Sequence, residues 1–178
     1  HEGATNFFNG EGTKGGFSYH LDEVALEPSD LPDDFYSTHA FTDYGKQFIE
    51  ERDKAKPFFM YMAYNAPHYP LHAPKEEVLK YQGKYMDGWQ KVRDDRFVRL
   101  KELGIIDADA EFSNSEKVIG GWDQLSEAEK IDMDLRMATY AAMIDIVDQQ
   151  VGRLVETLKD QSIYAVSYTH LTLPTKEG

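Results

Sequence analysis

The segment from Lys56 to Pro74, KPFFMYMAYNAPHYPLHAP, constrains the fold more than any other part of the chain. Its first half is apolar and aromatic on both alternating faces, which is typical of a central parallel strand covered by helices, so we predict a strand from Phe58 to Tyr64. Pro67, Pro70 and Pro74 then remove backbone donors and fix the local backbone. The sequence therefore predicts a buried strand that runs into a rigid turn.

Helical patterns flank this segment. Ser37 or Thr38 can cap a helix that Pro57 stops, and its apolar positions are Phe41, Tyr44, Phe48 and Ile49. A short helix is predicted near Lys75–Tyr81, and a longer one from Asp87 to Leu103 with Gly104 as its C-cap. The inward positions predicted for that longer helix are Trp89, Val92, Phe97, Leu100 and Leu103.

The longest helix is predicted to open with a capping box of Ser126 and Glu129 and to run to about Lys159. Its apolar stripe consists of Ile131, Leu135, Ala138, Ala142, Val151, Leu154, Val155 and Leu158. Residues 1–36 indicate a loop with one hairpin built around a strand-like stretch at 17–21, and residues 105–125 an acidic connection. The order helix, strand, helix favours an α/β sandwich.

Composition excludes several classes of function. The chain has 178 residues, of which 32 are acidic and 19 basic, and its formal charge of −13 argues against binding the phosphate backbone of nucleic acids. No apolar run approaches the length of a membrane span. With no cysteine, thiolate metal sites and cysteine nucleophiles are excluded within these residues. Oligomeric state is left open by the sequence.

His68 is the candidate site residue because it follows the predicted strand at the carboxyl end, where ligands gather in open α/β sheets. Prolines on both sides would hold its imidazole on a stiff backbone, which suits donation of a hydrogen bond or proton to a ligand. From spacing alone, the simpler interpretation is a histidine that fills a turn. His72 lies in the same loop, and His20 and His39 lack metal-ligand spacing.

The carboxylates give no metal site. Two adjacent pairs are interpreted as solvated surfaces, namely Asp33 with Asp34 and Asp94 with Asp95. Asp145 and Asp148 interrupt the apolar face of the long helix, so we expect at least one to be partly buried with a hydrogen-bond partner. We assign no metal ligand.

Residues 165–178 differ in composition from everything before them. From Val166 to Thr175 they resemble the translation of a transposon-derived sequencing adapter, with a natural strand as the competing interpretation. We therefore expect residues 165–178 to be non-native, and residues 1–164 to be the central part of a catalytic domain whose N- and C-terminal portions lie outside this chain.

Three blocks in order resemble the formylglycine-dependent sulfatases of the alkaline phosphatase superfamily. They are KPFFMYMAYNAPHYPLHAP, KYQGKYMDGWQKVRDDRFVRLKELGII and RMATYAAMIDIVDQQVGRLVETL, within residues 37–163. The resemblance implies a partial alkaline-phosphatase-like sandwich, with a mixed, mostly parallel sheet covered by helices. It also implies a formylglycine nucleophile and a divalent cation, usually calcium, in the complete enzyme. His68 matches the histidine that contacts the sulfate and assists departure of the alcohol.

The chain departs from the family pattern at the nucleophile, which is made from Cys or Ser two residues before a proline. The residues at that position are Leu26, Asp30, Ala55, Asn65, His68, His72 and Thr172, so the motif is absent. We expect it upstream of His1 and the remaining metal-binding residues beyond the long helix, and we expect this chain alone to be inactive.

The resemblance implies hydrolysis of sulfate esters of a small molecule or glycan, in the periplasm or outside the cell. Two alternatives stay open. One is a phosphodiesterase or phosphonate hydrolase of the same superfamily, and the other is a non-catalytic carbohydrate-binding descendant.

Overall fold

The computed structural model describes residues 4–12, 15–16, 19–112 and 121–167. These divide into two compact units: residues 1–70 with 145–178 form the first, and residues 71–144 the second. The resemblance to an adapter falls almost entirely on residues 168–178, which lie outside the described part. Each unit is treated by itself.

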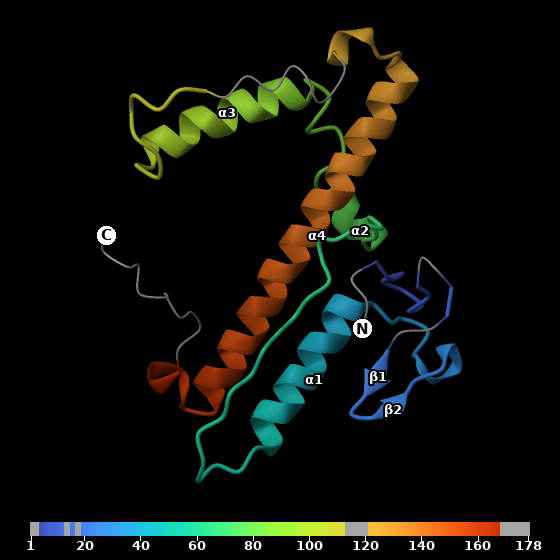
Figure 1. Cartoon of the computed structure of the whole chain (residues 1–178), viewed down its shortest axis with the longest axis vertical. Coiled ribbons are helices and arrows are strands. Elements are labelled where there is room, and N and C mark those ends of the chain that lie inside the picture. Colours follow the sequence, from blue (N-terminus) through green and yellow to red (C-terminus); the bar gives the residue numbers. More distant parts are fainter. Residues whose placement is uncertain (1–3, 13–14, 17–18, 113–120, 168–178) are drawn as a thin grey trace. The chain divides into compact units, whose positions relative to one another are not determined.

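The first unit contains helix α1, Ser37–Glu51, beside the C-terminal half of helix α4, Glu127–Asp160 (Figure 1). Strands β1, His20–Leu21, and β2, Val24–Ala25, pair antiparallel, with His20 opposite Ala25. This hairpin confirms the one predicted within residues 1–36, although residues 17–18 of the predicted strand are not described. Two short 3-10 helices complete the unit: η1, Pro28–Asp30, and η3, Tyr164–Val166.

Aromatic packing forms the core around α1. Phe7 is fully buried and stacks on Tyr36, with the ring centroids 5.9 Å apart. Tyr19 packs on Phe35 at 5.5 Å. Buried aromatic rings contribute both apolar area and a preferred contact geometry, so these pairs fix the approach of the N-terminal loop to α1.

The start of α1 corrects the predicted cap. The N-cap position is Tyr36, with no side-chain cap, because Ser37 and Thr38 already lie inside the first turn of the helix, where both are fully buried. The Ser37 backbone N–H donates instead to the Phe7 carbonyl oxygen at 2.8 Å. A buried first turn satisfies its donors with other backbone groups, which a propensity rule cannot foresee.

The predicted strand is extended but unpaired. Residues 57–64, here the extended segment, alternate from Met60 onward between half-buried and exposed positions, and Phe59 and Tyr61 are 87% and 81% exposed. Among the described residues, the sheet has only β1 and β2. The expectation of a strand covered on both faces is therefore wrong for this structure. Phe59 and Tyr61 leave one face exposed, and no neighbouring strand among the described residues forms a ladder with the segment.

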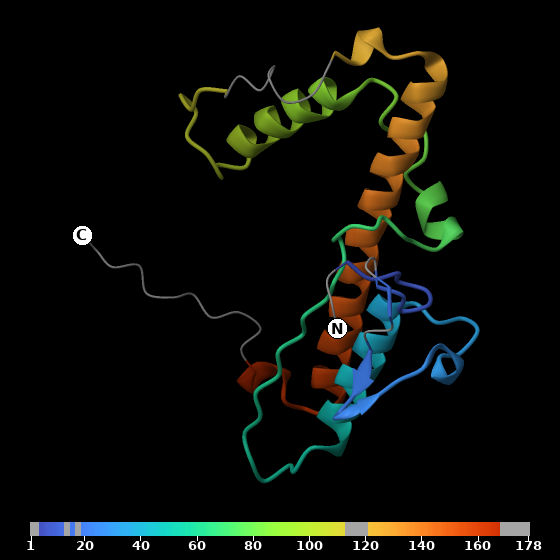
Figure 2. The same cartoon turned by 45° about the vertical axis from the view of Figure 1, so that its right-hand side comes forward.

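The extended segment lies along α1 and the C-terminal half of α4 in two views (Figures 1 and 2). Both neighbours belong to the same unit as the segment. An extended stretch beside two helices agrees with the α/β class, while the sheet that the sandwich requires is not shown.

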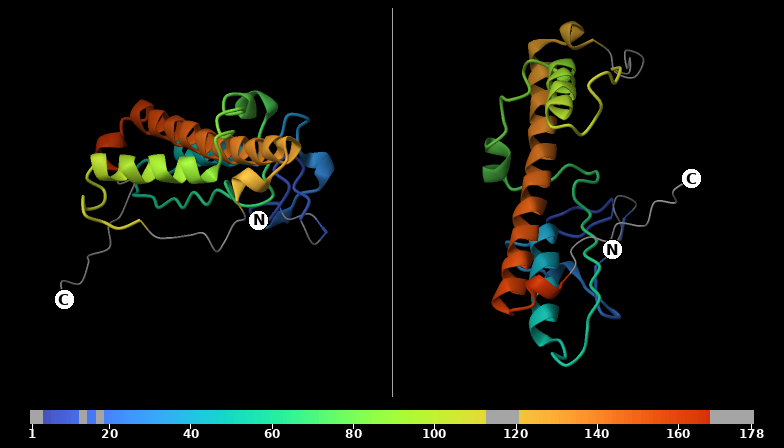
Figure 3. Two further views of the ribbon diagram at one scale, coloured as in Figure 1. Left: turned by 90° about the horizontal axis from the view of Figure 1, so that it is seen from above. Right: turned by 90° about the vertical axis from the view of Figure 1, so that its left-hand side faces the viewer.

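The second unit contains α2, Lys75–Leu79, α3, Trp89–Glu102, the 3-10 helix η2, Trp122–Gln124, and the N-terminal half of α4. α3 begins beside that half of α4 (Figure 3). All three α-helices were predicted within two residues of these bounds. Leu103 is the C-cap residue of α3, and Gly104 lies one position beyond the predicted cap, with a φ of 66° and its N–H donating to the Lys101 carbonyl oxygen at 3.0 Å, so the glycine ends the helix from the C′ position.

The capping box of α4 is confirmed, but its predicted stripe is only partly buried. The Ser126 backbone N–H donates to the Glu129 carboxylate at 2.8 Å, and the Glu129 N–H donates back to Ser126 Oγ at 3.4 Å. Ile131, Leu135 and Val151 are between 43% and 56% exposed. The buried ridge advances four residues at a time, through Asp134, Ala138, Ala142, Ile146 and Gln150.

Candidate functional site

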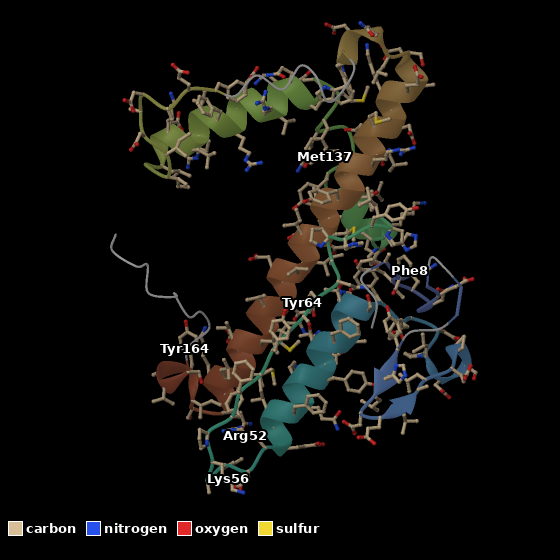
Figure 4. The ribbon with its side chains drawn as sticks, viewed as in Figure 1. Phe8, Arg52, Lys56, Tyr64, Met137 and Tyr164 are labelled. Carbon is tan, nitrogen blue, oxygen red and sulfur yellow. The ribbon has the colours of Figure 1, made fainter. Side chains whose placement is uncertain are left out.

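Side chains, rather than a strand ladder, hold the extended segment against α1. A Cβ atom at Gly45 would lie 2.9 Å from Met62 Sδ, so glycine at this position permits the close approach. The Tyr64 hydroxyl lies 2.8 Å from Thr42 Oγ1 (Figure 4). Because Thr42 Oγ1 donates its one hydrogen to the Thr38 carbonyl oxygen at 2.9 Å, Tyr64 is the donor in this pair.

Asn65 ends the extended segment and starts the turn that carries His68. Its side chain is only 5% exposed, and its Oδ1 accepts the Ser37 hydroxyl hydrogen at 3.3 Å. Its carbonyl oxygen accepts the His68 backbone N–H at 2.8 Å, closing a four-residue turn. The position of His68 is therefore set through Asn65 by the buried first turn of α1.

The Tyr19 hydroxyl shares this environment. Burial raises the pKa of Tyr19, and the nearby side chains of Ser37 and Asn65 oppose that rise. The side chains of Tyr19, Ser37 and Asn65, which hold the start of the His68 turn, are therefore all uncharged.

His68 itself is exposed, which leaves its ring accessible to a ligand. Its Nδ1 lies 2.6 Å from the Tyr69 carbonyl oxygen. A carbonyl oxygen can only accept, so Nδ1 carries a proton and the second ring nitrogen, Nε2, is the one available to a ligand. When the ring is cationic, Nε2 also bears a proton and can donate it.

The other histidines give weaker sites. His72 is half-buried, and burial lowers its pKa, which favours the neutral ring. His39 packs edge-on against Tyr36 with ring centroids 5.1 Å apart, and His20 lies exposed on β1. His68 belongs to the first unit and His72 to the second.

Both adjacent carboxylate pairs lie on the solvated surface, as predicted. Asp33 and Asp34 are exposed, and Asp94 and Asp95 pair with the side chains of Gln90 at 2.7 Å and Lys91 at 2.6 Å along α3. Of the other two acids, Asp145 is half-buried and has an interaction partner, while Asp148 is exposed, as predicted for such a pair.

The sequence interpretation missed Asp134, which is 3% exposed. Its carboxylate accepts the backbone N–H of Gly83 at 2.7 Å and that of Tyr85 at 2.8 Å. The available signal was its spacing of four residues from Ala138, which places it on the buried ridge of α4. This carboxylate supports the structure of the second unit by accepting two backbone donors.

The described residues do not supply a cation site. Within residues 4–12, 15–16, 19–112 and 121–167, no three acidic or histidine side chains gather in a way that could hold a metal ion. Those carboxylates described above that are exposed or have a single partner are therefore not assigned as calcium ligands.

A helix, an extended segment and a turn that carries an accessible histidine are consistent with a domain of the α/β class. The family model described as Sulfatase matches residues 1–167, and the chain belongs to the sulfatase family. That membership implies an alkaline-phosphatase-like α/β fold.

Relatives of known name agree with the family. An arylsulfatase of Klebsiella aerogenes is 40% identical over 129 residues, covering 72% of this chain and 28% of its own length. An uncharacterised sulfatase of Schizosaccharomyces pombe is 34% identical over 126 residues, covering 70% of this chain and 23% of its own. The chain thus spans about a quarter of the length of these relatives. No helix in the described ranges has the length and apolar character to cross a membrane.

Proposed function

We propose that residues 1–164 are the central part of a sulfatase catalytic domain and that the complete enzyme hydrolyses sulfate esters of an aryl alcohol or a carbohydrate. The similarity to an arylsulfatase supports sulfate-ester chemistry. By the same family relation we expect a periplasmic or secreted enzyme that binds neither nucleic acid nor membrane. A formylglycine nucleophile and a divalent cation are expected in the complete enzyme.

The observation that carries the proposal is the hydrogen bond between His68 Nδ1 and the Tyr69 carbonyl oxygen. It fixes the ring orientation and the tautomer, which leaves Nε2 as the ring nitrogen available to a ligand. In the complete enzyme the sulfuryl group would pass to the nucleophile as the bond between sulfur and the ester oxygen breaks, and that oxygen would keep the electron pair and receive the Nε2 proton. The alcohol then leaves as a neutral molecule, and His68 is left as a neutral imidazole.

The test uses the complete enzyme and two substrates that differ in leaving group. Nitrophenolate leaves readily without a proton, whereas an unsubstituted phenolate needs one. His68→Ala should therefore lower kcat for phenyl sulfate by about 10²–10⁴-fold, and lower kcat for 4-nitrophenyl sulfate by much less.

His20→Ala is the matched control, because His20 is an exposed histidine on β1. It should leave both substrates unaffected. Equal losses with both substrates would reject His68 as the proton donor and leave it as a sulfate-binding group, while no loss with either would remove it from the site.

A second experiment separates the sulfatase from the alternative phosphodiesterase or phosphonate hydrolase. The complete enzyme should turn over 4-nitrophenyl sulfate faster than bis(4-nitrophenyl) phosphate, and the reverse order would favour the phosphate-ester enzyme. Turnover of neither ester by a folded complete enzyme would favour the non-catalytic descendant. The 178-residue chain alone should hydrolyse neither ester, because it contains no nucleophile motif.

A further inference from the structure

A pocket of about 830 Å³ lies wholly within the second unit, residues 71–144. Its volume is in the range of small-molecule sites, which are concave and mostly apolar with a few polar groups. α3 contributes Trp89 and Phe97 to its wall, and α4 contributes Met133 and Met137, the latter labelled in Figure 4. None of its lining residues belongs to the unit that carries His68.

Two edge-on aromatic pairs shape this pocket. Trp89 and Trp122 have ring centroids 5.1 Å apart with an interplanar angle of 87°, and Phe97 and Phe112 are 4.6 Å apart at 60°. Edge-to-face pairs expose both ring faces and ring edges, which suit stacking with a flat aromatic molecule.

The charge of the pocket is opposite to that of the chain. Three arginines, Arg93, Arg96 and Arg136, and one acidic residue, Glu111, line it, whereas the whole chain carries a formal charge of −13. Concentrated cations beside an apolar wall favour an anion over a neutral or cationic ligand.

The three guanidinium groups differ in what they contact. Arg93 stacks over the Phe112 ring, 3.9 Å from its centroid, and Arg136 Nε donates to the Asp132 carboxylate at 2.8 Å. Arg96 is exposed, and it has no hydrogen-bond or ion-pair partner among the residues that the structure describes. Its fork of donors is therefore available for bidentate binding of a sulfate, sulfonate or carboxylate group.

We propose that this pocket binds an organic anion with a flat aromatic body. The ring lies among Trp89, Trp122 and Phe97, and the anionic group binds the Arg96 guanidinium at the exposed rim. The inference concerns the second unit alone and does not depend on the function proposed for His68.

The test uses the 178-residue chain, whose only two tryptophans, Trp89 and Trp122, both line the pocket. Tryptophan fluorescence therefore reports on this pocket directly. The probe is 4-toluenesulfonate, which cannot be hydrolysed as an ester. Two comparison compounds separate its parts: 4-toluenesulfonamide keeps the ring without the charge, and methanesulfonate keeps the charge without the ring.

We expect 4-toluenesulfonate to give a saturable fluorescence change. 4-Toluenesulfonamide should bind at least about tenfold more weakly, the size of one lost charge-assisted hydrogen bond, and methanesulfonate at least about tenfold more weakly because it has no ring to bury. Arg96→Gln should weaken 4-toluenesulfonate about tenfold and leave 4-toluenesulfonamide unchanged. Arg99→Gln is the matched control, because Arg99 lies on the same helix, pairs with Glu102 at 3.0 Å and does not line the pocket. Both arginines are exposed, so neither change should unfold the chain, as far-ultraviolet circular dichroism would verify.

Four results would overturn the inference. Equal binding of sulfonate and sulfonamide would show an apolar pocket without anion selectivity, and equal binding of methanesulfonate would remove the aromatic requirement. Absence of any saturable change, or an Arg96→Gln effect matched by Arg99→Gln, would remove the site.

Discussion

The Asp134 carboxylate on α4 accepts the backbone N–H of Tyr85 at 2.8 Å, and this bond ties the connection between α2 and α3 to the long helix. The same carboxylate accepts the Gly83 N–H at 2.7 Å. A buried acid that accepts two backbone donors replaces the water those donors would otherwise bind. The consequences for stability can be measured directly.

Asp134→Ala should lower the free energy of unfolding by about 2–4 kcal/mol, because it leaves two backbone donors without an acceptor. Urea denaturation followed by circular dichroism would measure the change. Asp132→Ala is the matched control, since Asp132 is exposed on the same helix and, among the residues that the structure describes, pairs only with Arg136; it should cost less than about 1 kcal/mol. Equal losses for the two variants would show that the buried bonds contribute nothing beyond a surface pair.

Gly88→Ala should destabilise the second unit and disturb the tryptophan pair. Gly88 has a φ of 89°, and a Cβ atom there would lie 2.6 Å from Trp122 Cγ. Strain of this backbone alone costs about 1–3 kcal/mol for a residue with a side chain. Thermal unfolding and the tryptophan emission maximum would report the two effects separately.

Gly83→Ala isolates the contribution of the clash. Gly83 has a similar φ of 84° but open space around the position of a Cβ atom. It should therefore show the loss of stability due to strain without a shift in tryptophan emission. A shift of the same size in both variants would contradict the contact between Gly88 and Trp122.

Tyr64 should make the first unit less stable at alkaline pH. Burial raises its pKa above the ordinary value of 10.0, an effect that the positive charge of Arg153 opposes. A raised folded-state pKa means that the unfolded chain loses its phenol proton first. Stability is therefore complete below pH 10.0 and falls as the pH rises through the folded-state pKa.

Tyr64→Phe should flatten this alkaline loss, measured as the unfolding midpoint in urea between neutral pH and about pH 11. Tyr61→Phe is the control on the same segment, because Tyr61 is 81% exposed. It should leave the pH dependence unchanged. If both substitutions flatten the curve alike, the burial of Tyr64 is not its cause.

Ser37→Ala should cost about 1–3 kcal/mol, because it leaves the Asn65 side-chain oxygen buried without its donor. A capping serine would lose a comparable amount, so stability alone does not separate the two roles. The distinguishing measurement is the order of the His68 turn, followed by the nuclear magnetic resonance shift of the His68 backbone N–H. That shift should move in Ser37→Ala and stay unchanged in Ser126→Ala, which removes the true cap of α4.

Local signals were enough to predict the helices. Gly104 ends α3, Ser126 and Glu129 open α4, and Pro57 lies beyond the end of α1, and each acts through the few residues around it. The turn after Tyr64 was predicted for the same reason, since prolines fix the backbone wherever they occur. These are features that nearest neighbours in the chain decide.

Contacts between distant residues account for the errors. Ser37 binds Asn65 from 28 positions away, and no propensity rule contains that partner. The buried ridge of α4 has Asp134 and Gln150 near its ends, so a search for apolar residues at helical spacing passes over both. The extended segment has the composition of a buried strand, but pairing depends on strands elsewhere. The role of His68 stays a prediction, because its neighbours define an accessible ring and not a reaction.

The extended segment has one further consequence, which concerns hydrogen exchange. From Phe58 to Met62, its backbone N–H groups have no ladder partners among the described residues, although Met62 and Tyr64 fix its path through side-chain contacts with α1. Protection from exchange follows hydrogen bonding, so these amides should exchange with solvent almost as fast as those of an unfolded peptide. The chain leading to His68 would then be well ordered in position yet nearly unprotected in isotope labelling.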